Sequence, residues 1–177
     1  KARETSLGDI PMVIGRTGWS GELSYELYLQ DRKKGNELFE IVHEAAKEFN
    51  AEVIAPNTIR TIEGGLLSYG SDFGREHNPY TIGLDRLVDV DQDVDFIGKD
   101  ALKKIKEDGP SEKLVGLEID GDPIRKAPEN FWPIFDTSQK KVGRLSRCFF
   151  SPRLQRNIGL AIVEIDYSEP GTVMTLE

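Results

Sequence analysis

The first part of the chain alternates between apolar and polar positions with a period of two. Met12-Val13-Ile14 is a short apolar run typical of a buried strand, and the Gly-, Thr- and Ser-rich residues 15–21 predict a turn after it. Polar residues then separate Leu23, Tyr25, Leu27 and Leu29. This spacing predicts a second strand with one apolar face, so Glu26 and Tyr28 should point together away from the leucines.

A helical period follows this strand. Over residues 33–49, apolar side chains recur at three- and four-residue steps, at Leu38, Ile41, Val42, Ala45 and Phe49. His43 lies between them, and we expect it at the surface or boundary of the helix. Residues 52–55 predict a short strand that ends at Pro56.

Capping residues mark a second helix. Asn57 can cap a helix that runs through Ile59 and Ile62, and Gly64-Gly65 weakens or ends it. Residues 72–79 predict a polar loop, and a further helix is predicted over 99–106.

The second half of the chain changes character after the linker-like residues 108–111. Short strands separated by turn residues are predicted at 114–119, 142–150, 158–165 and 172–176. They indicate a small β-barrel or sandwich. We therefore predict an α+β fold with two domains, an α+β lobe over residues 1–109 and an all-β lobe over residues 110–177.

Composition limits the classes of function. Of 177 residues, 38% are apolar and 31% charged, and the net charge is −8. An acidic chain repels phosphate backbones, which argues against nucleic-acid binding, and the sequence has no apolar run long enough for a membrane span. One basic cluster contrasts with the acidic net charge: four arginines fall within thirteen residues, at positions 144, 147, 153 and 156. They are either solvated surface residues or a docking point for a small polyanion.

Metal ligands and thiols are scarce. His43, His77 and Cys148 are the only residues of their types, so zinc has few ligands to draw on and no internal disulfide can form. A reducing cytoplasm is the simplest location. Aspartates alternate over 89–95, but the glycine and distal glutamate of a calcium loop are absent, so a solvated loop is favoured over calcium. We assign no metal site.

One polar and aromatic set of residues could bind a ligand: Trp19, Glu26, Tyr28 and Ser68. A carboxylate such as Glu26 can accept paired N–H donors from a planar heterocycle, and the faces of Trp19 and Tyr28 attract cations. The alternative is that both aromatic residues serve packing and that Glu26 is a solvated strand residue. These residues alone leave the function open, and no catalytic residue can be assigned.

Four longer motifs resemble those of the glycine-cleavage T-protein family. Residues 16–28 (RTGWSGELSYELY) resemble R-T-G-Y-T-G-E-D-G-F-E-I-Y, and residues 62–72 (IEGGLLSYGSD) resemble L-E-A-G-x-x-L-Y-G-x-D. Residues 95–102 (DFIGKDAL) match D-F-I-G-[KR]-x-A-L. Residues 151–161 (SPRLQRNIGLA) resemble S-P-T-L-x-x-N-I-A-L-A. The motifs occur in the family's order and span most of the chain.

Departures from these motifs narrow the resemblance. The aminomethyltransferases of the family carry A-R-D-T-L-R where residues 56–61 read PNTIRT, so Asn57 replaces a family arginine. This version, Trp19 and residues 128–132 (PENFW) are similar to the family's demethylases, which transfer a methyl group from dimethylsulfoniopropionate to tetrahydrofolate. A glycine-cleavage aminomethyltransferase and a non-catalytic folate-binding module remain the alternatives.

The resemblance implies a fold, a cofactor and roles for residues. The family has three lobes, which here implies a ferredoxin-like α/β lobe followed by a β-barrel lobe. Glu26 would hydrogen-bond the pterin of tetrahydrofolate, with Trp19 beside it, while Trp19, Tyr28 and Ser68 would contact the small-molecule substrate. The arginines near 150 would suit the glutamate tail of a folate. The products would be methylmercaptopropionate and 5-methyltetrahydrofolate.

Family enzymes are about twice this length, so we expect the chain to be the C-terminal half of a longer protein. The N-terminal half would then be its partner in forming the pocket, and the isolated chain would be inactive. Homodimerisation stays open.

Overall fold

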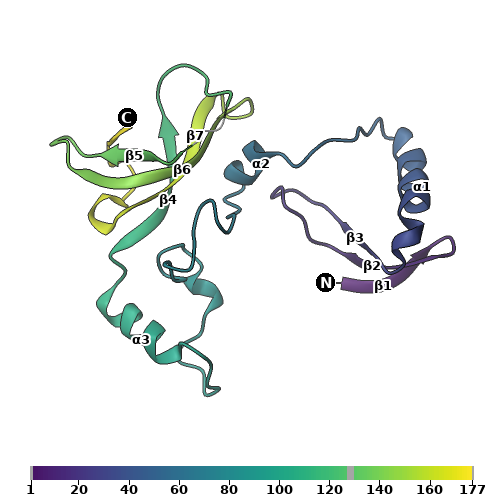
Figure 1. Cartoon of the computed structure of the whole chain (residues 1–177), viewed down its shortest axis with the longest axis horizontal. Helices are drawn as coiled ribbons and strands as arrows, with labels where there is room; N and C mark the ends of the chain where they lie inside the picture. The colour runs from purple at the N-terminus through teal and green to yellow at the C-terminus, as the bar shows by residue number, and fades with distance from the viewer. Residues whose placement is uncertain (1, 127–129, 177) are drawn as a thin grey trace. The chain divides into compact units, whose positions relative to one another are not determined.

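Two strands predicted near the N-terminus, and a third at residues 2–7 that was not predicted, form an antiparallel sheet in the computed structural model, which describes residues 2–126 and 130–176 (Figure 1). Residues 1–66 and 67–177 make two compact units, and each is described by itself. In the first unit the strand order is β1 (Ala2–Leu7), β2 (Ile10–Gly15) and β3 (Glu26–Leu29). Gly15 at the end of β2 pairs with Glu26 at the start of β3.

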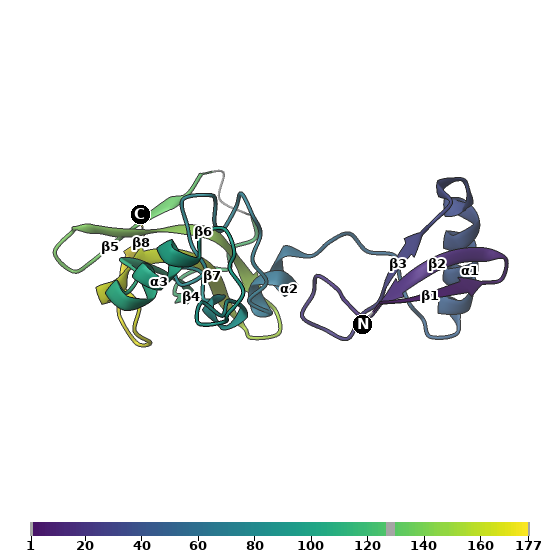
Figure 2. The same cartoon turned by 90° about the horizontal axis from the view of Figure 1, so that it is seen from below.

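The predicted amphipathic helix covers this sheet. The 3-10 turn η1 (Arg32–Lys34) leads into α1 (Gly35–Lys47), which lies beside the strands in Figures 1 and 2. Leu38 of α1 packs with Ile10 and Met12 of β2 to form the core of the unit. Leu38 is the one residue of the helix that is fully buried, so the apolar stripe predicted over 33–49 is only partly used.

Two predicted strand segments are irregular in the structure. Leu23 and Tyr25, predicted to lie on the apolar face of a strand, belong instead to a loop over 16–25 and are 70% and 59% exposed. Residues 52–55 also have no strand pairing, and Val53 and Ile54 are exposed. The pattern predicted these strands wrongly because a strand needs a hydrogen-bonded neighbouring strand as well as alternation, and neither segment has a strand partner among the described residues.

The helix predicted after Pro56 forms as α2 (Thr58–Glu63). The side-chain oxygen of Asn57 accepts hydrogen bonds from the amides of Ile59, at 2.9 Å, and Arg60. Gly64 caps the C-terminal end, and Gly65 follows with a positive φ of 61°. Both ends of this helix were therefore predicted correctly, because capping is a local property of the sequence.

The second unit combines a long irregular segment with a sheet. The segment contains the 3-10 turn η2 (Asp85–Leu87) and the predicted helix, now α3 (Lys99–Asp108). Five strands follow, with the 3-10 turn η3 (Ile165–Tyr167) before the last: β4 (Glu112–Ile119), β5 (Trp132–Phe135), β6 (Lys141–Ser151), β7 (Arg156–Glu164) and β8 (Thr175–Leu176). Four of them match predicted strands, whereas β5 was not predicted.

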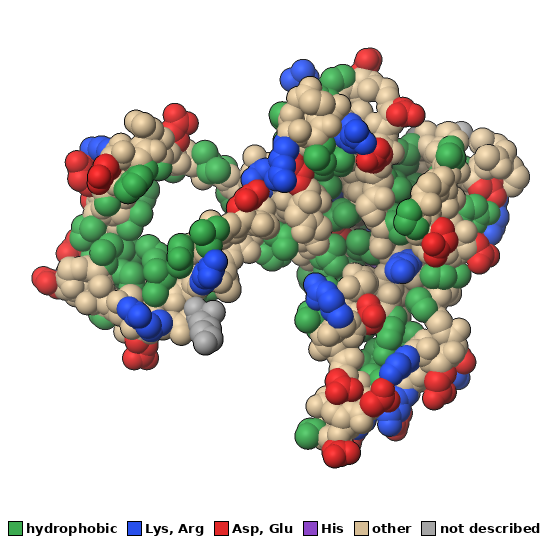
Figure 3. Space-filling view, turned by 180° about the vertical axis from the view of Figure 1, so that it is seen from behind, with side chains coloured by type: hydrophobic (Ala, Val, Ile, Leu, Met, Phe, Trp, Pro, Cys, Tyr) green, Lys and Arg blue, Asp and Glu red, His purple; other side chains and the backbone are tan. Residues whose placement is uncertain are grey.

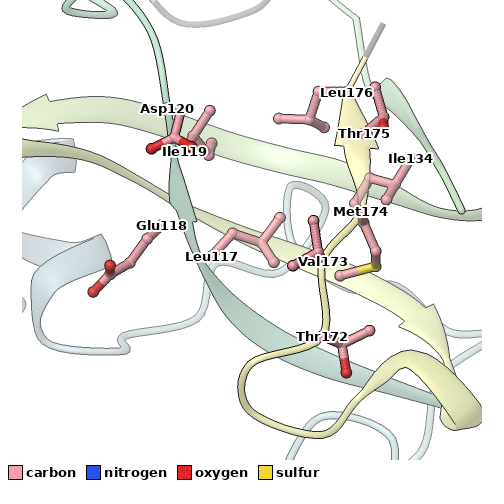
Figure 4. Close-up of a pocket in the computed structure, with 10 residues that line it drawn as sticks. All are labelled: Leu117, Glu118, Ile119, Asp120, Ile134, Thr172, Val173, Met174, Thr175 and Leu176. Carbon is pink, nitrogen blue, oxygen red and sulfur yellow. The ribbon is translucent and has the colours of Figure 1, made fainter. Parts of the chain in front are cut away.

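The five strands form an open sheet in the order β4-β7-β6-β5-β8. Its core is a set of buried residues from β5, β6 and β7: Ile134, Val142, Leu145, Cys148, Ala161 and Val163. Within the described residues the sheet does not close into the predicted barrel, because its edge strands β4 and β8 do not pair with each other. A cavity of about 390 Å³ lies between these edges, lined by Leu117 and Ile119 on one side and Leu176 on the other (Figure 4). The mixed α/β class is confirmed.

None of the helices described in residues 2–126 and 130–176 has the length and apolar character needed to cross a membrane.

Candidate functional site

The start of β3 brings together two of the residues predicted to form a binding site. Tyr28 Oη donates a hydrogen bond of 2.8 Å to Glu26 Oε2, so the two side chains lie on the same side of the strand, as the alternation predicted. Thr17, in the loop before β3, donates its hydroxyl to the same oxygen. Thr17 was not predicted as a site residue, although it lies inside the motif over residues 16–28.

These hydrogen bonds favour the ionised form of Glu26. The Thr17 hydroxyl, and then the Tyr28 hydroxyl, hold the pKa of the Glu26 carboxyl below its ordinary value of 4.5. The side chain is exposed, so this carboxylate can accept hydrogen bonds from a ligand at neutral pH.

Two glycines allow the close packing around Glu26. A side chain on Gly15 would lie 3.2 Å from the ring of Tyr28 and 3.1 Å from the hydroxyl of Thr17. A side chain on Gly18 would overlap Ser24, whose hydroxyl donates to the carbonyl of Thr17 at 3.1 Å. The two glycines thus let Thr17 and Tyr28 reach the same carboxylate oxygen.

The same loop carries Trp19, whose side chain is 57% exposed. The loop is tied to α2 at its far end, where Arg60 pairs with Glu22 and, at 2.9 Å, with Glu63. Gly21 and Gly64 meet backbone to backbone at this contact, since a side chain on Gly21 would lie 3.2 Å from the Cα atom of Gly64. Trp19 is therefore presented by a loop whose ends are fixed.

Ser68, the remaining predicted site residue, belongs to the second unit. It is half-buried, and its backbone amide donates to Asp72 Oδ2 at 2.7 Å. Among the predicted residues, the structure thus joins Glu26 and Tyr28 by direct contact, with Trp19 on the adjoining loop and Ser68 in a separate turn.

A buried ion pair was not predicted. Asp72 is fully buried, and its carboxylate accepts from Arg147 Nε at 2.8 Å and from Arg147 Nη2 at 2.5 Å. The Ser146 hydroxyl donates to the same carboxylate at 2.8 Å. A β-bulge between Leu145 and Arg147 breaks the alternation of β6, so the adjacent side chains of Ser146 and Arg147 both reach Asp72. The segment predicted as a polar loop over 72–79 is therefore anchored to the sheet at its first residue.

His77 continues this anchored segment. Its side chain is 3% exposed, and Nδ1 accepts a hydrogen bond from the amide of Gly74 at 2.9 Å. Nε2 lies 3.5 Å from the guanidinium of Arg144, which covers the ring of Phe131 at 4.5 Å.

Three of the four arginines near residue 150 make separate contacts within the chain. Arg147 pairs with Asp72, Arg144 stacks on Phe131, and Arg156 pairs with Glu118 at 2.5 Å. Acidic and basic side chains are interspersed on the face of the molecule shown in Figure 3. Arg144, Arg147 and Arg156 therefore each have a partner within the chain.

The chain's only thiol is not arranged for catalysis. Cys148 is fully buried in the core of the sheet, and this burial raises the pKa of its thiol to about 11. Among residues 2–126 and 130–176, no group of three or more histidines, cysteines or carboxylates is placed to hold a metal ion. Around Glu26, the structure places the hydroxyls of Thr17 and Tyr28 and the ring of Tyr28, which offer hydrogen bonding and aromatic contact.

Comparison with known families matches nearly the whole chain. Residues 1–92 match the family model of the GCVT N-terminal domain, and residues 112–177 match that of the glycine cleavage T-protein C-terminal barrel domain. The motif at residues 128–132 that resembles the demethylases is described only in part, because residues 128–129 lie outside the described residues.

Relatives of two kinds are similar to the chain. The dimethylsulfoniopropionate demethylase DmdA of Ruegeria pomeroyi is 32% identical over 170 residues, which cover 95% of this chain and 45% of the relative. An aminomethyltransferase of Symbiobacterium thermophilum is 36% identical over 175 residues, with coverage of 97% and 45%. The chain thus spans about half the length of these relatives.

A solved structure has the same fold. The glycine cleavage system aminomethyltransferase T of Bartonella henselae superimposes with a TM-score of 0.80 at 22% identity. The match covers 94% of this chain and 45% of that one.

Proposed function

The chain belongs to the glycine cleavage T-protein family, and we propose that the intact protein is a tetrahydrofolate-dependent one-carbon transferase. Relatives of both kinds, a demethylase and aminomethyltransferases, support this class of activity. Tetrahydrofolate supplies the nitrogen that accepts the one-carbon group.

The observation that carries the proposal is the state of Glu26. Its carboxylate is exposed, and the hydroxyls of Thr17 and Tyr28 lower its pKa, which keeps it ionised. A pterin ring presents N–H donors along one edge, and an ionised carboxylate is a strong acceptor for such donors. The rings of Tyr28 and Trp19 are 52% and 57% exposed, so their faces remain available for a flat ligand. These residues fit tetrahydrofolate.

For the substrate, we propose dimethylsulfoniopropionate as the leading candidate. A sulfonium carries a fixed positive charge, which aromatic faces attract with about 0.5–2 kcal/mol each. Its methyl group is already activated, because a neutral thioether leaves when the methyl is transferred. The reaction then needs mainly alignment of two bound molecules and little acid–base catalysis. In this proposal Trp19, Tyr28 and Ser68 contact the substrate.

The role of Asn57 as a helix cap favours methyl transfer from dimethylsulfoniopropionate over aminomethyl transfer. The aminomethyltransferase motif has an arginine here, whereas the Asn57 side chain caps α2 through the amides of Ile59 and Arg60. A capping asparagine supplies no positive charge for an anionic ligand. Glycine-cleavage aminomethyl transfer nevertheless remains the second candidate, because an aminomethyltransferase relative is 36% identical to the chain.

Several features of the intact protein belong to the same proposal. We assign folate binding to residues 1–109 and a separate β-rich part to residues 110–177. The rest of a family-length chain would complete the pocket. A reducing, cytoplasmic location suits the single thiol of Cys148.

Single-turnover methyl transfer tests the proposal. The full-length protein, in excess over dimethylsulfoniopropionate, is mixed with tetrahydrofolate, and 5-methyltetrahydrofolate is measured. We expect product, and we expect Glu26→Gln to weaken tetrahydrofolate binding roughly tenfold. Glu37→Gln is the matched control, since Glu37 is a glutamate of the same unit that pairs with Lys34 at 2.9 Å.

Other outcomes separate the alternatives. Ammonia and methylenetetrahydrofolate from an aminomethylated carrier protein, without demethylation, would establish the second candidate. Tetrahydrofolate binding with neither reaction would indicate a non-catalytic folate-binding module.

A further inference from the structure

The Glu26 carboxylate is held through one of its two oxygens. Thr17 Oγ1 and Tyr28 Oη both donate to Oε2, and Oε1 has no hydrogen bond to any residue that the structure describes. A carboxylate oxygen offers about two acceptor positions. Oε2 is therefore fully used, and Oε1 remains for a ligand.

The backbone of Thr17 is in turn held by Ser24. The Thr17 carbonyl accepts from the Ser24 hydroxyl at 3.1 Å, and the neighbouring Gly18 approaches Ser24 so closely that any side chain there would overlap it. Gly15, two residues earlier, is buried at the end of β2 and paired with Glu26 itself. Thr17 thus occupies a short segment fixed at both ends.

We propose that Thr17 is the positioning residue of this site: it fixes Oε2 of Glu26 and so presents Oε1 to an N–H donor of the ligand. The inference rests on the proposed function, because it takes that donor to belong to the pterin of tetrahydrofolate. It assigns the ligand's donors to Oε1 rather than to both oxygens. Thr17 acts through Glu26 and needs no contact with the ligand.

The role requires the threonine hydroxyl and has a pH signature. Without that hydroxyl, the pKa of Glu26 rises toward its ordinary value of 4.5. Because protonation removes the negative charge that strengthens the hydrogen bond accepted by Oε1, ligand binding falls as the pH falls through the pKa of Glu26. Loss of the Thr17 hydrogen bond therefore moves this fall in binding, the acid limb of the pH profile, to higher pH.

The test measures tetrahydrofolate binding to the full-length protein by calorimetry across the acidic pH range. We expect Thr17→Val to weaken binding about tenfold and to move the acid limb to higher pH. Thr17→Ser, which keeps the hydroxyl, should restore both the affinity and the limb. A thermal melt of each variant checks that it is folded.

A double-mutant cycle separates positioning from a structural role. If Thr17 acts through Glu26, Thr17→Val should have little further effect in a protein that already carries Glu26→Gln. An equal loss in both backgrounds, or unchanged binding by Thr17→Val alone, would overturn the inference and leave the proposed function standing. Failure of the wild-type protein to bind tetrahydrofolate would overturn both.

Discussion

At the scale of single residues, the most consequential contact joins positions 75 residues apart. Asp72 is fully buried and accepts hydrogen bonds from Ser146 and from two nitrogens of Arg147. Burial of charges costs free energy that only good geometry offsets, and these bonds supply that geometry. The contact holds the segment that contains Ser68 against β6.

Removal of one partner of this pair should be costly. We expect Asp72→Ala to lower the free energy of unfolding by about 3–5 kcal/mol, because the largely buried Arg147 guanidinium loses its ion pair with Asp72. Urea denaturation of the chain measures the change. Asp91→Ala is the matched control, since Asp91 pairs with Lys106 at 2.6 Å with both side chains largely exposed. Its loss should cost under about 1 kcal/mol, and equal losses would contradict this account.

Cys148 gives a prediction about alkaline pH. Burial raises the pKa of its thiol from 9.0 to about 11 in the folded chain. A raised folded-state pKa means that the neutral thiol stabilises the fold fully below pH 9.0, and that this stability is lost as the pH rises toward about 11. The loss should be of order 2–3 kcal/mol.

The measurement compares unfolding free energies of the wild-type chain and Cys148→Ala between pH 8 and 11. Tyrosine and lysine ionisation is common to both proteins, so the difference in slope isolates the thiol. Equal slopes would show that Cys148 ionises as readily in the fold as in the unfolded chain.

At the scale of elements, predictability follows the range of the interactions. Asn57 and Gly64-Gly65 marked both ends of α2 because caps are made by neighbours in sequence. The stripe around Leu38 predicted α1 for the same reason. Leu23, Tyr25 and residues 52–55 had strand-like patterns but lack strand partners, which a pattern does not reveal. Strand patterns likewise do not reveal whether the edge strands of a sheet pair with each other, so they did not predict that β4 and β8 stay unpaired with each other.

The site residues within a regular strand were likewise predictable from the sequence, whereas those in an irregular loop were not. Alternation placed Glu26 and Tyr28 on one side of a strand, and this held because β3 covers both residues. Thr17 lies nine positions before Glu26, in an irregular loop whose course no period describes. Its hydrogen bond to the carboxylate could be found only from the folded chain.

The pairing of β6 with β7 supplies a prediction for this scale. A side chain on Gly159 of β7 would lie 2.9 Å from the carbonyl oxygen of Arg147 and 2.7 Å from Leu145. Backbone at that distance cannot move aside easily, so Gly159→Ala should destabilise the chain by about 1–3 kcal/mol. Gly116→Ala in β4 is the control, since a side chain there meets nothing within 4 Å. Thermal denaturation of both variants compares them, and similar melting temperatures would contradict the packing argument.

At the scale of the whole molecule, the two units have unequal cores. The core cluster of residues 1–66 contains three buried apolar residues, Ile10, Met12 and Leu38. Six buried residues form the core cluster of the second unit. The second unit also contains the Asp72–Arg147 ion pair. Local stability follows buried apolar contact and protected hydrogen bonds, so it should differ along the chain.

Amide hydrogen exchange, followed by mass spectrometry, measures that difference. The slowest exchange is expected in β7, which pairs with β4 on one side and β6 on the other and is buried continuously from Asn157 to Val163. Residues 51–57, all exposed and outside any helix or strand, should exchange fastest, and β1 to β3 should lie between. Leu145→Ala, which empties a fully buried position of β6, should speed exchange in β6 and β7. Protection of β1 to β3 equal to that of β7 would mean that the first unit is more stable than its three-residue core cluster implies, and that stability in this chain is set by something other than the size of the core cluster.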